Sequence, residues 1–340
     1  MRDLIVAGGG PVGLATALYA ARAGLDVEVR ERRSGVIDKA CGEGLMPAAV
    51  TALGDLGVAL DGQPIAGIRY VDDRHAAEAR FRCGPGLGVR RTTLHGALRD
   101  AVALAGVAVI EAPVREIVDR GKGLEVDGER CGHLVAADGL HSPVRRMLGL
   151  DAPARRRRRY GLRTHVAMAP WTDFVEVHWS PGAEAYLTPV AGRQVGLAVL
   201  SEQRRPLPEL LAHFPLLADR LREVPWSAVR GAGPLRQRAR HGVAGRVLLV
   251  GDAAGYVDAL TGEGISVGLA QARAAVAAVA AGDPERYEGD WRRIGRRHDV
   301  LTHTLLAASR VPPVRRRIVG AAARLPRIFG AAVDQLARPA

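Results

Sequence analysis

The sequence predicts an α/β fold with a second, separate β-sheet and a helical tail. Residues 4–32 read as an apolar strand, a glycine-rich turn, an apolar helix and an alternating strand, which is how a βαβ unit begins. Residues 161–200 contain further strand-like segments with no helix between them, which indicates an additional sheet. At 340 residues, the chain is long enough for about two domains with sizeable cores.

Three glycines follow the first strand at the spacing Gly8-x-Gly10-x-x-Gly13, with Pro11 inside the turn. In this pattern the first glycine permits a tight turn, the second lets the backbone approach a pyrophosphate, and the third lets the helix pack closely on the strand. The helix that follows, Leu14 to Ala23, directs free N–H groups and partial positive charge toward the phosphates. The order of these elements predicts a bound dinucleotide.

An acidic residue, Glu31, ends the second strand 18 residues after Gly13, and Arg32 follows it. A carboxylate at this place can accept hydrogen bonds from the ribose hydroxyls of an adenosine. The same negative charge repels a 2′-phosphate. We therefore expect a stably held dinucleotide other than NADP.

The composition is that of an ordinary globular protein, with 48% apolar and 25% charged residues. The first strand begins at residue 4, which leaves no room for a signal peptide, and no uncharged apolar run reaches the ~18 residues that span a bilayer. We therefore expect a cytoplasmic protein with reduced thiols. The cysteines are odd in number and lack the spacing of a metal site, so we expect no bound metal: Cys41, Cys83 and Cys131.

The formal net charge of +12 comes from two arginine-rich places, Arg155–Arg159 and residues 284–340. Neither is accompanied by a helix-turn-helix, a set of zinc ligands or an aromatic-rich basic sheet, and aromatic residues make up only 4% of the chain. We therefore interpret Arg155–Arg159 as solvated side chains and expect no binding of nucleic acid.

The remaining segments alternate between strand and helix patterns. Pro47 to Leu56 and a segment around Leu94 to Val102 have helical apolar spacing. The predicted buried strands are 107–110, 114–118, 123–126, 134–137 and 247–250, and shorter sheet segments are predicted at 68–71 and 79–82.

The middle of the chain predicts strands at 161–167, 174–179, 185–189 and 194–200, followed by helices over 207–221. His165 and His178 lie on these strands, where a structural histidine is commoner than a catalytic base. After residue 283, three amphipathic helical pieces, residues 300–308, 315–323 and 328–336, are separated by Pro312-Pro313 and Pro326. These pieces could cover the core, line an apolar entrance or lie on an anionic membrane surface.

A second glycine-rich turn, Cys41-Gly42-Glu43-Gly44, follows the first unit. Two glycines beside an acid suit a loop that is pressed against a flat ligand. Cys41 is either a thiol that takes part in chemistry or a small packed residue, and its spacing alone favours the second interpretation.

Two further motifs point to a known family. Each of them directly follows a predicted strand, as the first glycine motif does. They are DGLHSPVR, residues 138–145, and GDAAGYVDALTGEGISVGLAQA, residues 251–272. With residues 4–32, these segments resemble the flavoproteins that include para-hydroxybenzoate-hydroxylase-like monooxygenases, flavin-dependent halogenases and geranylgeranyl reductases. The resemblance implies a tightly bound FAD and a Rossmann-like domain interleaved with a β-sheet substrate domain.

The resemblance also implies which residues contact the cofactor. Asp252 would bind the FAD ribityl chain, Arg91 the phosphates, and the helix start at Ile265-Ser266 would stabilise negative charge on the reduced flavin. Together, the first motif and the resemblance predict contacts from Gly8, Gly10, Pro11, Gly13, Glu31, Arg32, Arg91, Val114, Asp138, Asp252, Gly262, Gly264, Ile265 and Ser266.

Within the family, KACGEGLMP at residues 39–47 resembles the geranylgeranyl-reductase branch, in which the cysteine lies near the flavin. The resemblance therefore makes Cys41 a candidate catalytic residue. Tyr186 is a second candidate, because it falls where the family's substrate sheet faces the flavin ring. The halogenase tryptophan motif with its lysine is absent, and Asp258-Ala259 stands where the family usually has a proline.

The resemblance implies three interleaved regions. Residues 1–62, 88–152 and 240–282 would form the FAD-binding domain, residues 63–87 and 153–239 the substrate domain, and residues 283–340 a helical C-terminal region. The leading hypothesis is a monooxygenase that uses NAD(P)H or another transient reductant to hydroxylate a hydrophobic aromatic or polyketide-type molecule. The alternatives are a reductase of prenyl double bonds and a non-catalytic, flavin-loaded protein at the membrane surface. The sequence does not indicate an oligomeric state.

Overall fold

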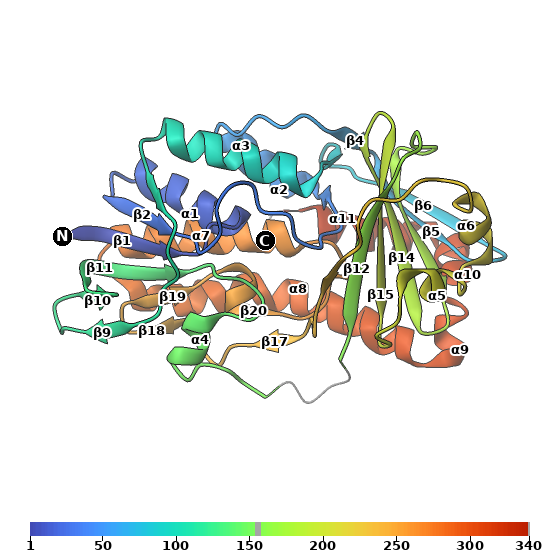
Figure 1. The fold of residues 1–340 in the computed structure, drawn as a ribbon. Coiled ribbons are helices and arrows are strands. Elements are labelled where there is room, and N and C mark those ends of the chain that lie inside the picture. Colours follow the sequence, from blue (N-terminus) through green and yellow to red (C-terminus); the bar gives the residue numbers. More distant parts are fainter. Residues whose placement is uncertain (154–157, 339–340) are drawn as a thin grey trace.

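The computed structural model describes residues 1–153 and 158–338, and its first sheet contains the glycine-rich start of the chain (Figure 1). The strands of this sheet are β1 (Arg2–Ala7), β2 (Val27–Arg30), β8 (Ala108–Ile110), β9 (Ile117–Asp119), β10 (Leu124–Val126), β11 (Glu129–Ala136), β18 (Val243–Ala244) and β19 (Val247–Leu249). Their order is β18-β19-β11-β1-β2-β8, and β10 and β9 extend the sheet from β11. β8, β2, β1, β11 and β19 run parallel, as a βαβ start predicts.

Apolar side chains on both faces of β1 explain why this sheet is buried. Leu4 and Val6 pack into one core cluster with Leu14, and Ile5 packs into another cluster on the opposite face. α1 packs against both α3 and α7. The helices of this part are α1 (Pro11–Arg22), α2 (Pro47–Asp55), α3 (Arg91–Leu104), α4 (Pro143–Met147) and α7 (Gly264–Ala280).

Two strand predictions in this sheet were wrong in detail. The segment 107–110 was expected to be buried, but β8 is exposed, with Val109 at 39% and Ile110 at 44%. The reason is that β8 is the edge strand and, within the described part of the chain, pairs with β2 alone. The segment 114–118 was expected to be one strand, but β9 begins at Ile117 and Val114 lies before it in the core.

The second sheet lies at the other end of the molecule (Figure 1). Its strands are β5 (Gly67–Val71), β6 (Ala76–Arg80), β12 (Tyr160–Val166), β13 (Phe174–Ser180), β14 (Ala183–Ala191), β15 (Gln194–Ser201) and β16 (Arg230–Ala232). Their order is β16-β12-β15-β14-β13-β5-β6, with only the pair of β13 and β5 parallel. The α/β class, the interleaved second sheet and the helical C-terminal region are thereby confirmed.

Smaller elements connect the two sheets. They are β3 (Gly44–Leu45), β4 (Gln63–Ile65) and β7 (Gly86–Gly88) in one sheet, β17 (Gln237–Arg238) and β20 (Gly255–Tyr256) in another, and the helices α5 (Leu207–Leu211) and α6 (Pro215–Arg220). The helices predicted over 207–221 are confirmed as two, because Pro215 cannot continue α5 and instead begins α6.

The C-terminal region consists of α8 (Tyr287–Arg310), α9 (Pro312–Arg315), α10 (Ile318–Arg324) and α11 (Pro326–Ala337). α8 begins earlier than the amphipathic piece predicted there, and Pro312 and Pro326 begin α9 and α11. α10 and α11 pack on β6. Phe329 of α11 lies 4.8 Å from the ring of Tyr70 on β5, so this region covers one face of the second sheet.

Of the arginines expected to be solvated, residues 155–157 lie outside the described part of the chain, Arg158 is exposed and Arg159 is buried. Arg159 is buried because Glu184 and Asp258 both pair with its guanidinium. No helix in the described chain is both long enough and apolar enough to cross a membrane.

Candidate active site

A cavity of about 260 Å³ lies between the two sheets, and both predicted cofactor turns line it. Gly10 and Pro11 reach it from the start of α1, and Gly262, Gly264 and Ile265 reach it from the start of α7. Two segments that are about 250 residues apart in the sequence therefore face one space, as the FAD prediction requires. Both helix N-termini direct unpaired N–H groups and partial positive charge toward this space.

The glycines of the first turn are required by close contacts. Gly8 has φ +102°, and a side chain at this position would also meet the carbonyl oxygen of Ala137 at 2.5 Å. A Cβ at Gly13 would stand 1.8 Å from the carbonyl oxygen of Gly8. The turn can therefore keep α1 against β1 only with glycine at these positions. Neither Gly8 nor Gly13 lines the cavity itself.

Glu31 is buried directly behind this turn. One of its carboxylate oxygens, Oε2, accepts the N–H of Gly9 at 2.9 Å, and the other, Oε1, accepts Nε–H of Arg33 at 2.8 Å. Burial raises the pKa of Glu31, but the hydrogen bonds from Arg33 and Gly9 outweigh it and hold the pKa below its ordinary value. Glu31 is therefore an anion that supports the turn. Arg32, beside it, is exposed.

Charged groups of both signs face the cavity. Arg91, at the start of α3, and Asp252, after β19, both line it, together with Lys39. Burial raises the pKa of Asp252, and the positive charges of Lys39, Arg91 and Arg145 oppose that rise. Burial and the neighbouring arginines lower the pKa of Lys39. This arrangement suits a ligand that carries both phosphates and hydroxyl groups.

Three of the predicted contact residues have a buried polar atom without a partner in the described chain, and one of them, Arg91, lines the cavity, which fits a ligand that accepts its hydrogen bond. Asp138 Oδ1, Arg91 Nε and Ser266 Oγ are buried and have no hydrogen-bond partner among the described residues. Such orphaned atoms are uncommon in a finished core, because each costs free energy unless a ligand or water satisfies it. Asp138 and Ser266 lie outside the cavity lining. Val114 also lies outside it, in the core beside Val126.

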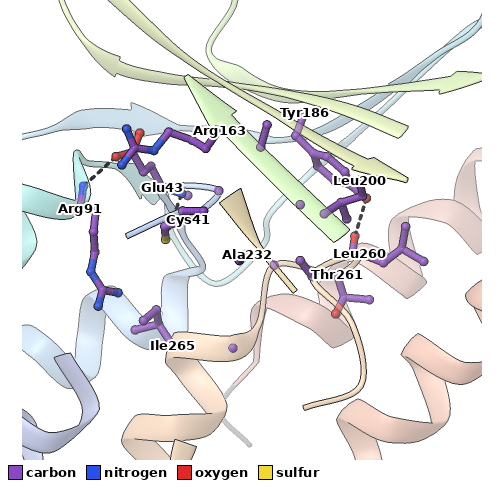
Figure 2. A pocket seen from close by; sticks show the side chains of 18 of the residues that line it. Cys41, Glu43, Arg91, Arg163, Tyr186, Leu200, Ala232, Leu260, Thr261 and Ile265 are labelled. Carbon is purple, nitrogen blue, oxygen red and sulfur yellow. Dashed lines mark hydrogen bonds between the residues drawn. The ribbon is translucent and has the colours of Figure 1, made fainter. Parts of the chain in front are cut away.

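Cys41 lines the cavity from the loop before β3, as the resemblance predicted. Figure 2 shows its thiol on the same side of the cavity as Glu43 and Arg91. The Sγ of Cys41 accepts the N–H of Glu43 at 3.4 Å. Burial is the largest cause that raises the pKa of Cys41, and the positive charge of Arg91 opposes it. The thiol is therefore protonated near neutral pH.

The opposite wall of the cavity is mostly apolar and comes from the second sheet. Tyr186 of β14 lines it, and its hydroxyl donates to the carbonyl oxygen of Leu260 at 3.2 Å (Figure 2). Burial raises the pKa of Tyr186 well above its ordinary value. Other apolar residues of this wall are Ile68, Leu162, Val175, Val177 and Leu200. This wall suits a hydrophobic substrate.

Sequence reasoning missed the pair that Glu43 makes with His165. His165 Nε2 lies 2.6 Å from Glu43 Oε2, and both residues are at most 3% exposed. The sequence predicts a structural histidine on a strand at His165 and indicates no more for Glu43 than an acid between two glycines. The sequence signal for this pair was the acid between two glycines. A loop that packs against a ligand shields its acidic side chain from solvent, so that side chain needs a partner within the protein.

Among the described residues, no group of histidine, cysteine and acidic side chains is arranged to hold a metal ion. The site therefore consists of two helix starts, a charged side, a thiol-bearing loop and an apolar wall.

Comparison with known proteins agrees with this geometry. Residues 110–283 match the family model described as FAD binding domain. The chain is 31% identical over 332 residues to a menaquinone reductase of Mycolicibacterium smegmatis, which covers 87% of this chain and 80% of that protein. It is 28% identical over 310 residues to digeranylgeranylglycerophospholipid reductase 1 of Methanopyrus kandleri, which covers 78% of this chain and 77% of that protein.

Among solved structures, a flavoprotein/dehydrogenase from Cytophaga hutchinsonii superposes with a TM-score of 0.86 at 18% identity, over 98% of this chain and 92% of that one. At this identity, the likeness concerns the fold. The family match covers half of the chain. Of the predicted cofactor residues, those that line the cavity are Gly10, Pro11, Arg91, Asp252, Gly262, Gly264 and Ile265. The chain therefore belongs to the FAD-binding-domain family of flavoproteins and is an FAD-dependent oxidoreductase.

Proposed function

We propose that this chain is a reductase that adds two hydrogens across a carbon–carbon double bond in a prenyl chain. The observation that carries the proposal is the cavity in which the FAD turns, the thiol of Cys41 and an apolar wall meet. The relatives support it, because both are named reductases and one is named for a lipid with geranylgeranyl chains.

FAD, when it is bound and reduced, supplies a hydride. The protein contributes the other requirements. Arg91 would hold the phosphates of the cofactor and Asp252 its ribityl hydroxyl groups, and the apolar wall would orient the substrate and exclude water from it. The thiol of Cys41 supplies the proton, since burial keeps it protonated near neutral pH. One hydride and one proton saturate one double bond, and NAD(P)H or another transient reductant must then restore the reduced cofactor.

Monooxygenation, the leading hypothesis from the sequence, becomes the competing function. It would use the same cofactor and the same apolar wall. We place reduction first because the loop of Cys41 faces the cavity and because the named relatives are reductases. The third hypothesis, a flavin-loaded protein without turnover, gives no role to the Cys41 loop.

The deciding experiment uses purified protein with FAD, a reductant and prenylated quinones, under labelled oxygen. Reduction predicts a product that gains two hydrogens and no labelled oxygen, and the reaction should also proceed without oxygen. Monooxygenation predicts one labelled oxygen atom in the product. If neither product forms and the substrate does not accelerate reoxidation of the flavin, both enzymatic proposals fail.

We also propose that the C-terminal region binds to the surface of a membrane through exposed apolar side chains, without crossing it. Leu325 is 51% exposed and Ile328 is 64% exposed, and both lie beside exposed arginines, Arg324 and Arg327. Apolar tips flanked by arginines suit the interface of an anionic bilayer. Such contact would bring the site close to lipids that carry prenyl chains.

A further inference from the structure

His165 connects the cavity to the surface through the second sheet. It lies on β12 and is 2% exposed. On one side, its Nε2 is 2.6 Å from Oε2 of Glu43, which lines the cavity. On the other side, its Nδ1 is 3.3 Å from the hydroxyl oxygen of Ser227.

Ser227 brings this chain of polar atoms to solvent. It is exposed, and it belongs to the segment between α6 and β16. Two hydrogen bonds to the backbone of His165 fix the position of Ser227. The N–H of Ser227 donates to the carbonyl oxygen of His165 at 2.9 Å, and the hydroxyl oxygen of Ser227 accepts the N–H of His165 at 3.0 Å. Three exchangeable groups therefore lie in sequence from water to the cavity.

The neighbours of His165 determine which ring nitrogen carries the proton. Arg163 Nη1 lies 3.3 Å from Nδ1, and a guanidinium can only donate. Nδ1 must therefore be an acceptor, so the proton of the neutral ring is on Nε2 and points at Glu43. This tautomer can pass a proton to Glu43 while Nδ1 takes one from Ser227.

Glu43 has an uncommon backbone conformation, and its carboxylate contacts both His165 and the backbone of Arg91. Its φ is +60°, a region that non-glycine residues rarely adopt. Its second carboxylate oxygen, Oε1, accepts the N–H of Arg91 at 2.9 Å (Figure 2). The backbone N–H of Glu43 lies 3.4 Å from Sγ of Cys41, and both residues line the cavity, so the carboxyl group and the thiol belong to one short turn.

Other charged groups lie around His165 and Glu43. From β12, Arg163 pairs with Asp38 and also donates to the carbonyl of Lys39 at 3.2 Å. From β16, Arg230 lies 3.4 Å from the same Asp38. Asp38 therefore compensates the positive charge of Arg163, and Arg163 does not need Glu43 as an ion-pair partner.

We propose that Ser227, His165 and Glu43 form a proton path from solvent to the cavity that returns to Cys41 the proton consumed in each reduction. The end of the path at Cys41 rests on the proposed function. In one passage, water gives a proton to Ser227, Ser227 gives its own to His165 Nδ1, His165 gives the one on Nε2 to Glu43, and Glu43 gives it to the Cys41 thiolate. One proton enters and one leaves, and no electrons move.

The first test does not depend on any substrate. In the oxidised protein with FAD bound, labelled with ¹⁵N-histidine, we expect NMR to show His165 protonated on Nε2, with the signal assigned by its loss in His165→Gln. Exchange of this proton with deuterium oxide should be slower in Ser227→Val, and the conservative Ser227→Thr should retain fast exchange. A proton on Nδ1, or equal exchange in Ser227→Val and the native protein, overturns the path.

The second test measures the steps of the reaction separately. We expect His165→Gln and Glu43→Gln to slow product formation by on the order of 10²-fold and to flatten its pH profile, with reduction of the flavin unchanged. Equal slowing of both steps at every pH would show a structural role and overturn the proposal. If the native protein reduces no prenyl double bond, the proposed function fails, whereas the NMR test still decides whether the path exists.

Discussion

Cys41 has the clearest individual consequence for activity. Replacing the thiol in Cys41→Ser substitutes a group that is a much poorer acid, so we expect the double-bond reduction to slow by on the order of 10²-fold. Binding of FAD and its reduction should stay as they are, because the serine is nearly isosteric. Stopped-flow absorbance of the flavin separates these steps.

The control for that variant is Cys83→Ser. Cys83 is exposed, does not line the cavity, and donates to the carbonyl oxygen of Ala337 at 3.5 Å. It should react like the native protein. Equal product formation in Cys41→Ser and Cys83→Ser would remove Cys41 from the mechanism.

Asp258 gives the molecule a specific pH dependence. Burial raises the pKa of Asp258 from 3.8 to about 6, and the charge of Arg159 opposes the rise. Because the folded protein holds this proton more tightly than the unfolded chain, the stabilising contribution is complete below about pH 4. It is lost as the pH rises through about 6.

The measurement is the free energy of unfolding in urea between pH 4 and 7. We expect Asp258→Asn to remove part of the decline with rising pH, whatever its effect on absolute stability. Identical pH dependence in the variant and the native protein would show that Asp258 titrates normally.

At the scale of elements, the contact of α1 with β1 depends on Gly13. Since a Cβ there would stand 1.8 Å from the Gly8 oxygen, Gly13→Ala must displace the helix or the turn. We expect a loss of about 1–3 kcal/mol in unfolding free energy and weaker binding of FAD. Urea unfolding and flavin titration measure the two effects.

A matched control is Gly54→Ala. Gly54 lies in the last turn of α2, is exposed and has no atom near its added Cβ, so the change should not destabilise the helix and should add at most about 0.5–1 kcal/mol. If Gly13→Ala binds FAD as well as Gly54→Ala, the close packing of the first turn is not needed for the cofactor.

The C-terminal helices allow a test of membrane contact. Ile328→Asp places a charge on an exposed apolar tip of α11, so binding to vesicles with anionic lipids should weaken. Leu104→Asp changes an even more exposed leucine at the end of α3 and should bind as the native protein does. Sedimentation with vesicles measures this difference, and equal binding by the two variants would count against contact through α11.

For the whole molecule, FAD couples parts that are distant in the sequence. The starts of α1 and α7, the Cys41 loop and the second sheet all line one cavity, so the cofactor binds only when they are assembled. We expect 100-fold excess of FAD over its dissociation constant to stabilise the folded protein by about 2.7 kcal/mol. Thermal unfolding with and without FAD checks this value, and an unchanged midpoint would contradict binding at the assembled cavity.

The C-terminal helices also contribute to the fold of the second sheet. Phe329 packs on Tyr70 and is 8% exposed, although it lies far along the chain from β5. Arg315 of α9 lies 2.8 Å from Glu184 on β14, beside Arg159. These contacts explain why an arginine-rich tail contains apolar stripes, and why the prediction from the sequence that Arg159 is solvated was wrong.

The sequence by itself determined the α/β class, the glycine turns and the FAD family, because these depend on local spacing that chemistry constrains tightly. Gly8 and Gly13 tolerate no side chain, so their pattern is visible in one dimension. Only the tertiary structure decided that β8 is an exposed edge and that Glu43 meets His165. Strand order and contacts between residues 122 positions apart depend on how the two sheets pack, and no local pattern records that packing.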